Sequence, residues 1–311
     1  MESFNHYAIA KRSIAGISQD VATRQWSLHF RKKNKASIEI STSDAIASKI
    51  RTRYILLRRS VADMQIVVGA LSIAIAFSWL ERKFPVRRQK RLRPGWFTDV
   101  CHWVFNQTIV NVGVVIGAIP LYILLGWAIN PSFQTQVARQ PGYLQLLEAI
   151  FFAEVSFYLV HRLFHQVPYL WKFHAIHHSS EHLDWLASVR FHPVDMVAAR
   201  LGIGVPLVIL GFRADTFGFY IVFNLIQSIF IHANVRCRLP LLRWLIGDPQ
   251  LHHWHHSKDI HNKNFGHPLL DLLFGTLYNP RPGEFPRAVG VEQRVPANYL
   301  QQLVYPFSDR R

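Results

Sequence analysis

The stretch YLQLLEAIFFAEVSFYLVHRLFHQVPYLWKFHAIHH, residues 143–178, decides the fold of this chain. Its first half, residues 143–160, is apolar, and its second half carries five histidines. About 20 apolar residues of helix are needed to cross the hydrocarbon core of a bilayer. The stretch therefore predicts a membrane helix whose end leads directly into a row of imidazoles.

The histidines recur at helical spacing. HRLFH (161–165) places two of them four residues apart, and HAIHH (174–178) and HHWHH (252–256) place three at intervals of three and four. Side chains at these intervals share one helix face, so each cluster can present its imidazoles together. The eight histidines with this spacing are His161, His165, His174, His177, His178, His252, His255 and His256. His253 is expected to point about 100° away from His252.

A ninth histidine, His232 in FIHANV (230–235), ends an apolar run and is expected to face the same compartment. Tetrahedral zinc takes about four protein ligands, so nine histidines predict two metal ions. Imidazole binds iron, zinc, copper and nickel, and the spacing does not choose among these metals.

The composition favours a membrane protein. Half of the residues are apolar and 17% are charged, against about 25% in soluble domains. The net charge of +16 comes largely from residues beside apolar runs, as on the cytoplasmic flank of membrane spans. No C2H2 or RNP pattern accompanies this charge, so no nucleic-acid partner is predicted. Two cysteines without a CxxC motif predict neither a disulfide framework nor a thiolate metal site.

Apolar runs place the expected spans at 61–80, 103–129 and 143–160, followed by a hairpin of 197–212 and 215–231. The first arm of the hairpin is short for a span, so it is expected to dip into the bilayer or to cross it with help from its neighbours. Residues 82–93 carry seven Lys/Arg, whereas the loop 131–142 carries one. This difference predicts that residues 82–93 lie on the cytoplasmic side of the membrane. The histidines then all face the cytoplasm, in either a bacterial inner membrane or an endoplasmic reticulum. The predicted fold is all-α, about four transmembrane helices with a cytoplasmic helical cap holding a histidine-rich dimetal site.

These runs divide the chain into four segments. Residues 1–60 are a basic N-terminal extension that lacks a signal-peptide layout. It is interpreted as a lipid-bound tail or targeting segment, and translation starting at Met64 is the alternative. Residues 61–130 hold the first two spans, 131–280 form the histidine-box catalytic domain with the third span and the hairpin, and 281–311 are a C-terminal tail.

The ordered series HRLFH, HAIHHSS, FHP, HANV and HHWHHSKDIHNKNFG, with DLLFGT (271–276), resembles the fatty acid hydroxylase/sterol desaturase superfamily, particularly its bacterial members. The resemblance covers about residues 65–280. It implies a membrane-embedded non-haem di-iron centre, two iron ions that use O2 as co-substrate. The nine histidines named above match the family's ligands. The implied substrate is a lipid (sterol, fatty acyl, carotenoid or ether lipid), hydroxylated or desaturated at an aliphatic C–H bond.

Four further residues are expected in or around this centre. His192 matches an HP dipeptide of the sterol branch and is interpreted as a ligand, a neighbour of a ligand or a turn residue. Glu154 lies two turns before His161 on one helix face, and carboxylates often orient ligating imidazoles. Asn264 and Asp271 follow the last box and are expected to orient His255 or His256. Ser228 occupies the position of a tenth histidine in some relatives, which leaves water or His192 as the tenth ligand.

No flavin, nicotinamide or iron–sulfur motif occurs, so electrons are expected from a separate ferredoxin or cytochrome with its reductase. Two alternatives to an oxygenase are a zinc protease and a metal-handling protein. A membrane zinc protease is disfavoured because HRLFH lacks the glutamate of HExxH. A metal transporter or metal-binding protein is the non-enzymatic alternative, but transporters place their polar ligands near the bilayer midplane.

Overall fold

The computed structural model describes residues 52, 64–65 and 67–308. The chain divides into two units, Met1–Met64 and Gln65–Arg311, and every helix from α3 onward belongs to the second. The predicted extension 1–60 lies outside the described residues except for Thr52, as does the start of the predicted first span. The described part of that span is a helix over residues 67–83.

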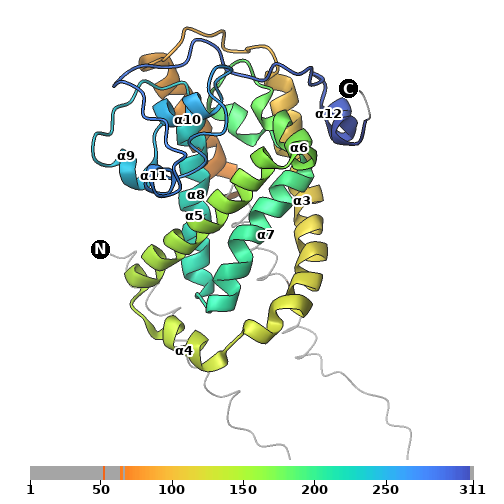
Figure 1. Cartoon of the computed structure of the whole chain (residues 1–311), viewed down its shortest axis with the longest axis vertical. Coiled ribbons are helices and arrows are strands. Elements are labelled where there is room, and N and C mark those ends of the chain that lie inside the picture. Colours follow the sequence, from red (N-terminus) through yellow and green to blue (C-terminus); the bar gives the residue numbers. More distant parts are fainter. Residues whose placement is uncertain (1–51, 53–63, 66, 309–311) are drawn as a thin grey trace, which may run out of the picture. The chain divides into compact units, whose positions relative to one another are not determined.

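Four helices are long and apolar enough to cross a membrane (Figure 1). They are α3 (Trp96–Leu125, extended by the 3-10 turn Gly126–Ala128), α5 (Gly142–Gln166), α7 (Pro193–Leu210) and α8 (Ala214–His232). All regular structure in the described residues is helical apart from two isolated β-bridges. The prediction of an all-α protein with about four transmembrane helices is confirmed. Both arms of the predicted hairpin are among the four, and the predicted first span lies partly outside the described residues.

Helix α7 lies against α3 and α5 in the middle of the bundle. Glycines make the α3 contact close: a β-carbon at Gly113 would lie 2.7 Å from Val197, and one at Gly117 would lie 2.6 Å from Leu201. Small residues allow such approach between membrane helices. Gly211, at φ 84°, ends α7 in the left-handed conformation, and α8 begins three residues later.

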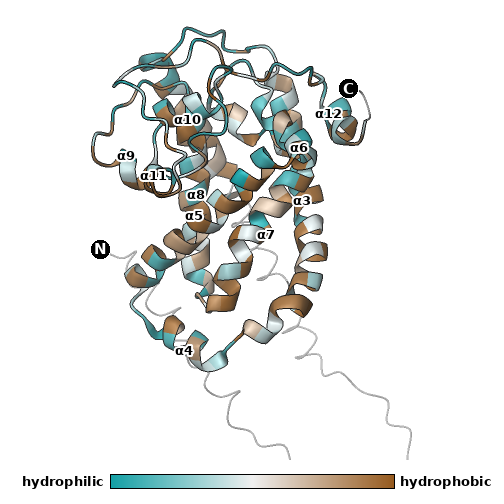
Figure 2. Cartoon of the chain, viewed as in Figure 1, coloured by the Kyte–Doolittle hydropathy of each residue, from teal (hydrophilic) through white to brown (hydrophobic). Residues whose placement is uncertain are grey.

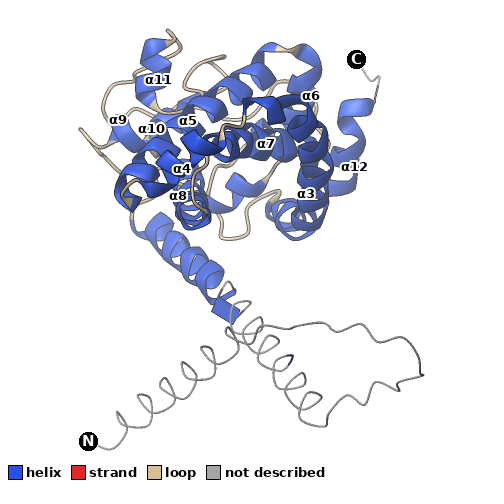
Figure 3. Ribbon diagram, turned by 90° about the horizontal axis from the view of Figure 1, so that it is seen from below, coloured by secondary structure: helices blue, strands red, loops and turns tan. Residues whose placement is uncertain are grey.

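Short helices form a cap at one end of the bundle. They are α6 (Pro168–His178), the 3-10 turn η2 (Trp185–Val189), α9 (Arg243–Ile246), α10 (Pro249–His255), α11 (Pro268–Leu273), α12 (Tyr299–Val304) and η3 (Tyr305–Phe307). At the opposite end α4 (Pro131–Arg139) joins α3 to α5. Figure 2 shows apolar colours along α3, α5, α7 and α8 and more polar segments over the cap, and Figure 3 shows the same helices from below.

Prolines set where the cap helices begin. Proline occupies the first turn of α6, α7, α10 and α11, where its missing N–H costs nothing. Asp248 adds a side-chain cap to α10 by accepting from the Leu251 N–H. Two of the three histidine clusters therefore lie on helices whose starts are fixed only a few residues upstream.

Candidate metal centre

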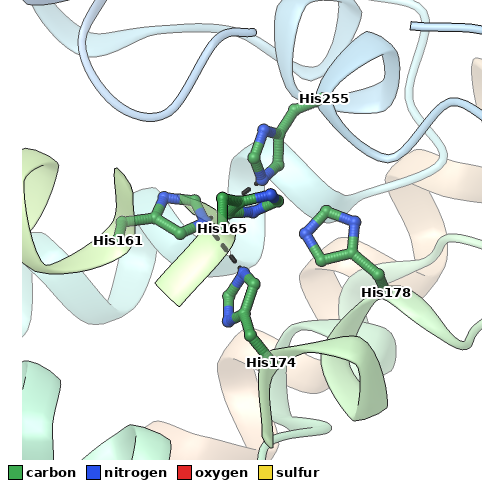
Figure 4. Close-up of side chains that lie close together, drawn as sticks. All are labelled: His161, His165, His174, His178 and His255. Atoms are coloured by element: carbon green, nitrogen blue, oxygen red, sulfur yellow. Dashed lines mark hydrogen bonds between the residues drawn. The ribbon is translucent and has the colours of Figure 1, made fainter. Parts of the chain in front are cut away.

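The nine predicted histidines gather in two groups. A five-histidine group, shown in Figure 4, contains His161, His165, His174, His178 and His255. A four-histidine group contains His177, His232, His252 and His256. Within each group one ring nitrogen per residue lies within 4.8 Å of all the others. The fold thus brings together the eight histidines selected by their spacing and His232, which was selected by its place at the end of an apolar run.

Helices α6 and α10 contribute to both groups. His174 and His178 of α6 join the five-histidine group, whereas His177, between them in sequence, joins the other. Residues four apart are offset by about 40° around a helix, and residues three apart by about 60° in the opposite sense. One histidine-bearing face can therefore meet two neighbouring ions along its two edges. Helix α5 completes the first group, and α8 completes the second.

The Nε2 atoms stand at the spacing of adjacent ligands on one ion. In the five-histidine group the Nε2 of His161 lies 2.9 Å from that of His174 and 3.1 Å from that of His255. In the four-histidine group the Nε2 of His252 lies 2.8 Å from that of His232 and 3.1 Å from that of His256. Metal–nitrogen bonds of about 2.0–2.1 Å at right angles would separate two ligand atoms by about 2.9 Å.

The other ring nitrogens show that these contacts are not hydrogen bonds. The Nδ1 of His161 lies 2.5 Å from the Phe265 carbonyl, and that of His255 lies 2.7 Å from the Lys263 carbonyl. A carbonyl only accepts, so in a neutral ring Nδ1 carries the proton and Nε2 a bare lone pair. Two such lone pairs 3.1 Å apart repel each other, and a bound cation would offset that repulsion.

The same arrangement occurs in the four-histidine group. His177 and His232 direct Nδ1 at the carbonyls of Arg190 (3.1 Å) and Ser228 (2.6 Å). Their Nε2 atoms are also 3.1 Å apart. Burial, reinforced by neighbouring histidines, lowers the pKa of the α6 and α10 histidines well below 6.5. Neutral imidazoles at physiological pH are the form that binds a metal, so the donor set fits a metal ion in each group.

Asp195 is a site residue that the sequence reasoning missed. Its Oδ2 lies 2.7 Å from the Nδ1 of His174, and both side chains are buried. Asp195 follows His192 by three residues in the first turn of α7, which points it back toward the cap. The HP dipeptide was therefore the sequence signal for this part of the site. The side chain that contacts a histidine of the group is Asp195, three residues after His192.

Asn264 and Asp271 contact the centre through the backbone between them. The Asn264 amide donates to the carbonyls of Leu251 and Tyr278, and the Asp271 carboxylate accepts from the N–H groups of Phe265 and Gly266. These bonds fix a segment whose carbonyls, at 263 and 265, accept from His255 and His161. Through this segment the predicted pair is linked to His255 and His161, and not to His256.

His192 and Glu154 lie outside both groups. His192 caps α7, its Nδ1 accepting from the Val194 N–H and its Nε2 facing the Leu303 carbonyl, each at 3.1 Å. Glu154 lies beside His267 rather than beside His161, whose Nδ1 is already taken by the Phe265 carbonyl. His253 also points away from the groups, toward the Ala233 carbonyl, as its helical position predicted.

Comparison with known proteins supplies the family. A sequence model described as fatty acid hydroxylase matches residues 146–276, from α5 through α11. The chain is also 30% identical over 264 residues to an ornithine lipid hydroxylase of Rhizobium tropici, which covers 82% of this chain and 79% of that protein. The chain belongs to the fatty acid hydroxylase family. The resemblance read from the histidine boxes is thereby confirmed.

Other relatives match this chain over shorter segments. A human alkylglycerol monooxygenase is 27% identical over 127 residues, 40% of this chain and 28% of that protein. A human fatty acid hydroxylase domain-containing protein 2 is 27% identical over 175 residues, 56% of this chain and 49% of that protein. No solved structure matches the chain.

Proposed function

We propose that this chain is a membrane-bound monooxygenase that holds two iron ions and hydroxylates an aliphatic C–H bond of a lipid. The reaction is R–H + O2 + 2 electrons + 2 protons → R–OH + H2O, with the electrons from a separate one-electron carrier protein. The observation that carries the proposal is the convergence of nine histidine nitrogens into two adjacent groups. Two iron ions bound there would supply the activation of O2 and the oxidation of the C–H bond.

The chain's own residues would hold the ions and keep the centre dry. Seven of the nine histidines are buried and the other two, His165 and His252, are partly buried, so the groups are screened from bulk water. Carbonyls from three separate segments, together with the Asp195 carboxylate, fix the ring orientations before a metal binds. Such outer partners raise the basicity of ligands and hold their geometry.

The comparisons favour hydroxylation over desaturation, because the relatives named for an activity are hydroxylases or monooxygenases. Their names refer to an ornithine lipid and to alkylglycerol, which suggests a membrane lipid with an acyl or alkyl chain as the substrate. Four apolar helices beneath the histidine groups agree with a substrate that arrives through the bilayer.

The test is the metal content of the full chain purified without oxygen, measured with Mössbauer spectra on iron-57 material. We expect about two irons per chain with a coupled signature. His177→Ala, which removes a member of the four-histidine group, should lose at least one of them. His182→Ala, a nearby histidine outside both groups, is the matched control and should retain both.

The iron-loaded protein, given a chemical reductant and membrane lipids under 18O2, should then yield a lipid that carries one 18O atom. One zinc per chain, or metal that does not depend on His177, would contradict the di-iron proposal and support a metal transporter or metal-binding protein. Two irons without any oxidised lipid would contradict the lipid substrate.

A further inference from the structure

The chain from Lys263 to Phe274 leads from the metal centre to an exposed apolar surface. The carbonyls of Lys263 and Phe265 accept from two proposed ligands. His267, two residues on, lies beside Glu154 of α5. Helix α11 follows at once and exposes its leucines. Three features thus occupy successive positions of one short segment: the ligand partners, a buried polar pair and an apolar face.

The Glu154–His267 pair leaves a buried carboxyl oxygen and a buried ring nitrogen without hydrogen-bond partners. Glu154 is 93% buried in a membrane-spanning helix, and its Oε1 has no partner. Its Oε2 lies 3.3 Å from the Nε2 of His267, but the two atoms are not aligned for a hydrogen bond. The hydroxyl of Tyr220, from α8, lies within hydrogen-bonding reach of the carboxyl. An ionisable group at this depth is costly and usually marks a functional site.

His267 contributes a second polar atom without a partner. Burial lowers its pKa to about 4, so the ring is neutral at physiological pH. Its Nε2, like the Oε1 of Glu154, has no hydrogen-bond partner. A ligand whose polar part carries an N–H or O–H group would give these buried atoms a partner.

An exposed apolar face covers the pair. We call it the α9–α11 face and define it by Leu241, Leu242, Leu245, Leu269, Leu272 and Leu273, all exposed. The two helices pack against each other and lie together in Figure 1. Gly247, at the end of α9, lies against Ile231 of α8. The ring of Phe274 stacks on that of Tyr158 of α5, with the ring centroids 4.9 Å apart. The face therefore closes over α5 and α8, the helices that carry Glu154 and Tyr220.

A bilayer is the occupant that fits this face. Helices of four and six residues cannot span a membrane, yet they expose only leucines outward. The spans that lie under this face also expose apolar residues, among them Leu159 on α5 and Leu225 on α8. The exposed Arg236 lies in the segment that leads into α9, where it can meet lipid phosphates. Short apolar segments with basic flanks lie in the headgroup region of a membrane.

We propose that the α9–α11 face lies in the headgroup region and admits the lipid substrate, and that Glu154 and His267 receive a hydrogen-bond donor of its polar part, a hydroxyl, an amide N–H or an ammonium. The inference rests on the proposed function and deepens it. Glu154 lies seven residues before His161, about 10 Å along the helix. A polar group held there would fix which carbon of the chain reaches the metal centre.

Photolabelling of the full chain in phosphatidylcholine vesicles tests this docking proposal and does not require catalytic turnover. The probe is an ester-linked lipid with a primary amine in its headgroup and a diazirine near the start of an acyl chain. Its matched control carries a trimethylated amine, which keeps the charge and removes the donor. We expect the primary amine to label residues 241–245 and 267–274, about tenfold more than the trimethylated probe does.

Variants separate the pair from the face. Glu154→Gln and His267→Asn should each reduce the preference for the primary amine about tenfold. Leu272→Glu with Leu273→Glu should reduce labelling by both probes. Leu300→Glu with Val304→Glu, exposed apolar positions on the equally short α12, should leave labelling at 267–274 unchanged. Metal content serves as the folding check, and either variant of the pair is sufficient if the other misfolds.

Labelling confined to α3 or α12, or equal for the two probes and unchanged in both variants of the pair, would overturn the inference. Labelling as expected, but without oxidised lipid from the iron-loaded protein, would support the docking site and count against the proposed oxygenase. The two proposals can therefore fail separately.

Discussion

The carboxylate of Asp195 accepts from the Nδ1 of His174 at 2.7 Å, deep in the cap. The neighbouring rings of His161 and His255 direct the same nitrogen at backbone carbonyls. Among the hydrogen bonds of the described residues, His174 is the one member of the two groups that a carboxylate orients. A full negative charge behind one ligand makes that imidazole a stronger electron donor than its neighbours.

Asp195→Asn is expected to weaken metal binding in the five-histidine group about 10- to 100-fold, the usual loss for such a partner. The amide is nearly isosteric but cannot carry the charge. Competition with a chelator at pH 7.5, followed by metal analysis, measures the change. Asp215→Asn, an exposed acid at the other end of the bundle, is the control. Equal retention by the two variants would show that the carboxylate does not tune the site.

Asp99→Asn is expected to destabilise the protein by about 3–5 kcal/mol, because it leaves the buried Arg190 without a carboxylate partner, whereas Arg93 keeps Asp184. Asp99 holds Arg93 at 2.6 Å and Arg190 at 2.5 Å, and the Arg190 carbonyl accepts from His177. The melting temperature and the metal content per chain should fall together. The exposed Arg213–Asp215 pair is a matched comparison, and breaking it should cost about 0–1 kcal/mol. Similar losses from both pairs would contradict this assignment.

Asn264 tests the segment that carries two carbonyl partners. Its φ is 58°, so Asn264→Gly keeps the backbone but removes the amide bonds to Leu251 and Tyr278, whereas Asn264→Ala also strains the backbone. We expect iron per chain to fall in both, with a further loss of about 1–3 kcal/mol of stability in the alanine variant. The melting temperature and the iron content per chain measure these effects. If the alanine variant keeps the wild-type melting temperature and iron content, Asn264 does not fix this segment.

The pH dependence arises from the buried histidines of α6 and α10. Their pKa values are lowered by burial, so the unfolded chain, at about 6.5, binds protons more readily than the folded one. Stability from these groups is present above about pH 6.5 and is lost as pH falls through the lowered values. The melting temperature of metal-free protein should therefore be level from about pH 8 to 7 and fall on further acidification. A melting temperature that rises as the pH falls toward 5 would contradict this prediction.

The sequence alone determined much of this protein. Helical spacing selected eight of the nine histidines, because residues three and four apart share a face whatever the helix packs against, and the end of an apolar run selected His232. Apolar runs gave the helices that can span a membrane, since their length and composition are local properties. The order of the histidine boxes was sufficient to place the chain in its family.

Only the tertiary structure decided how the histidines divide between two groups and what orients them. That division depends on how α5, α6, α8 and α10 face one another, which the period of a single helix does not fix. Backbone carbonyls are present at every residue, so no side-chain pattern marks those at 190, 263 and 265. Glu154 lies on the expected face of α5, but the packing of α11 turns His267 toward it and gives His161 a different partner.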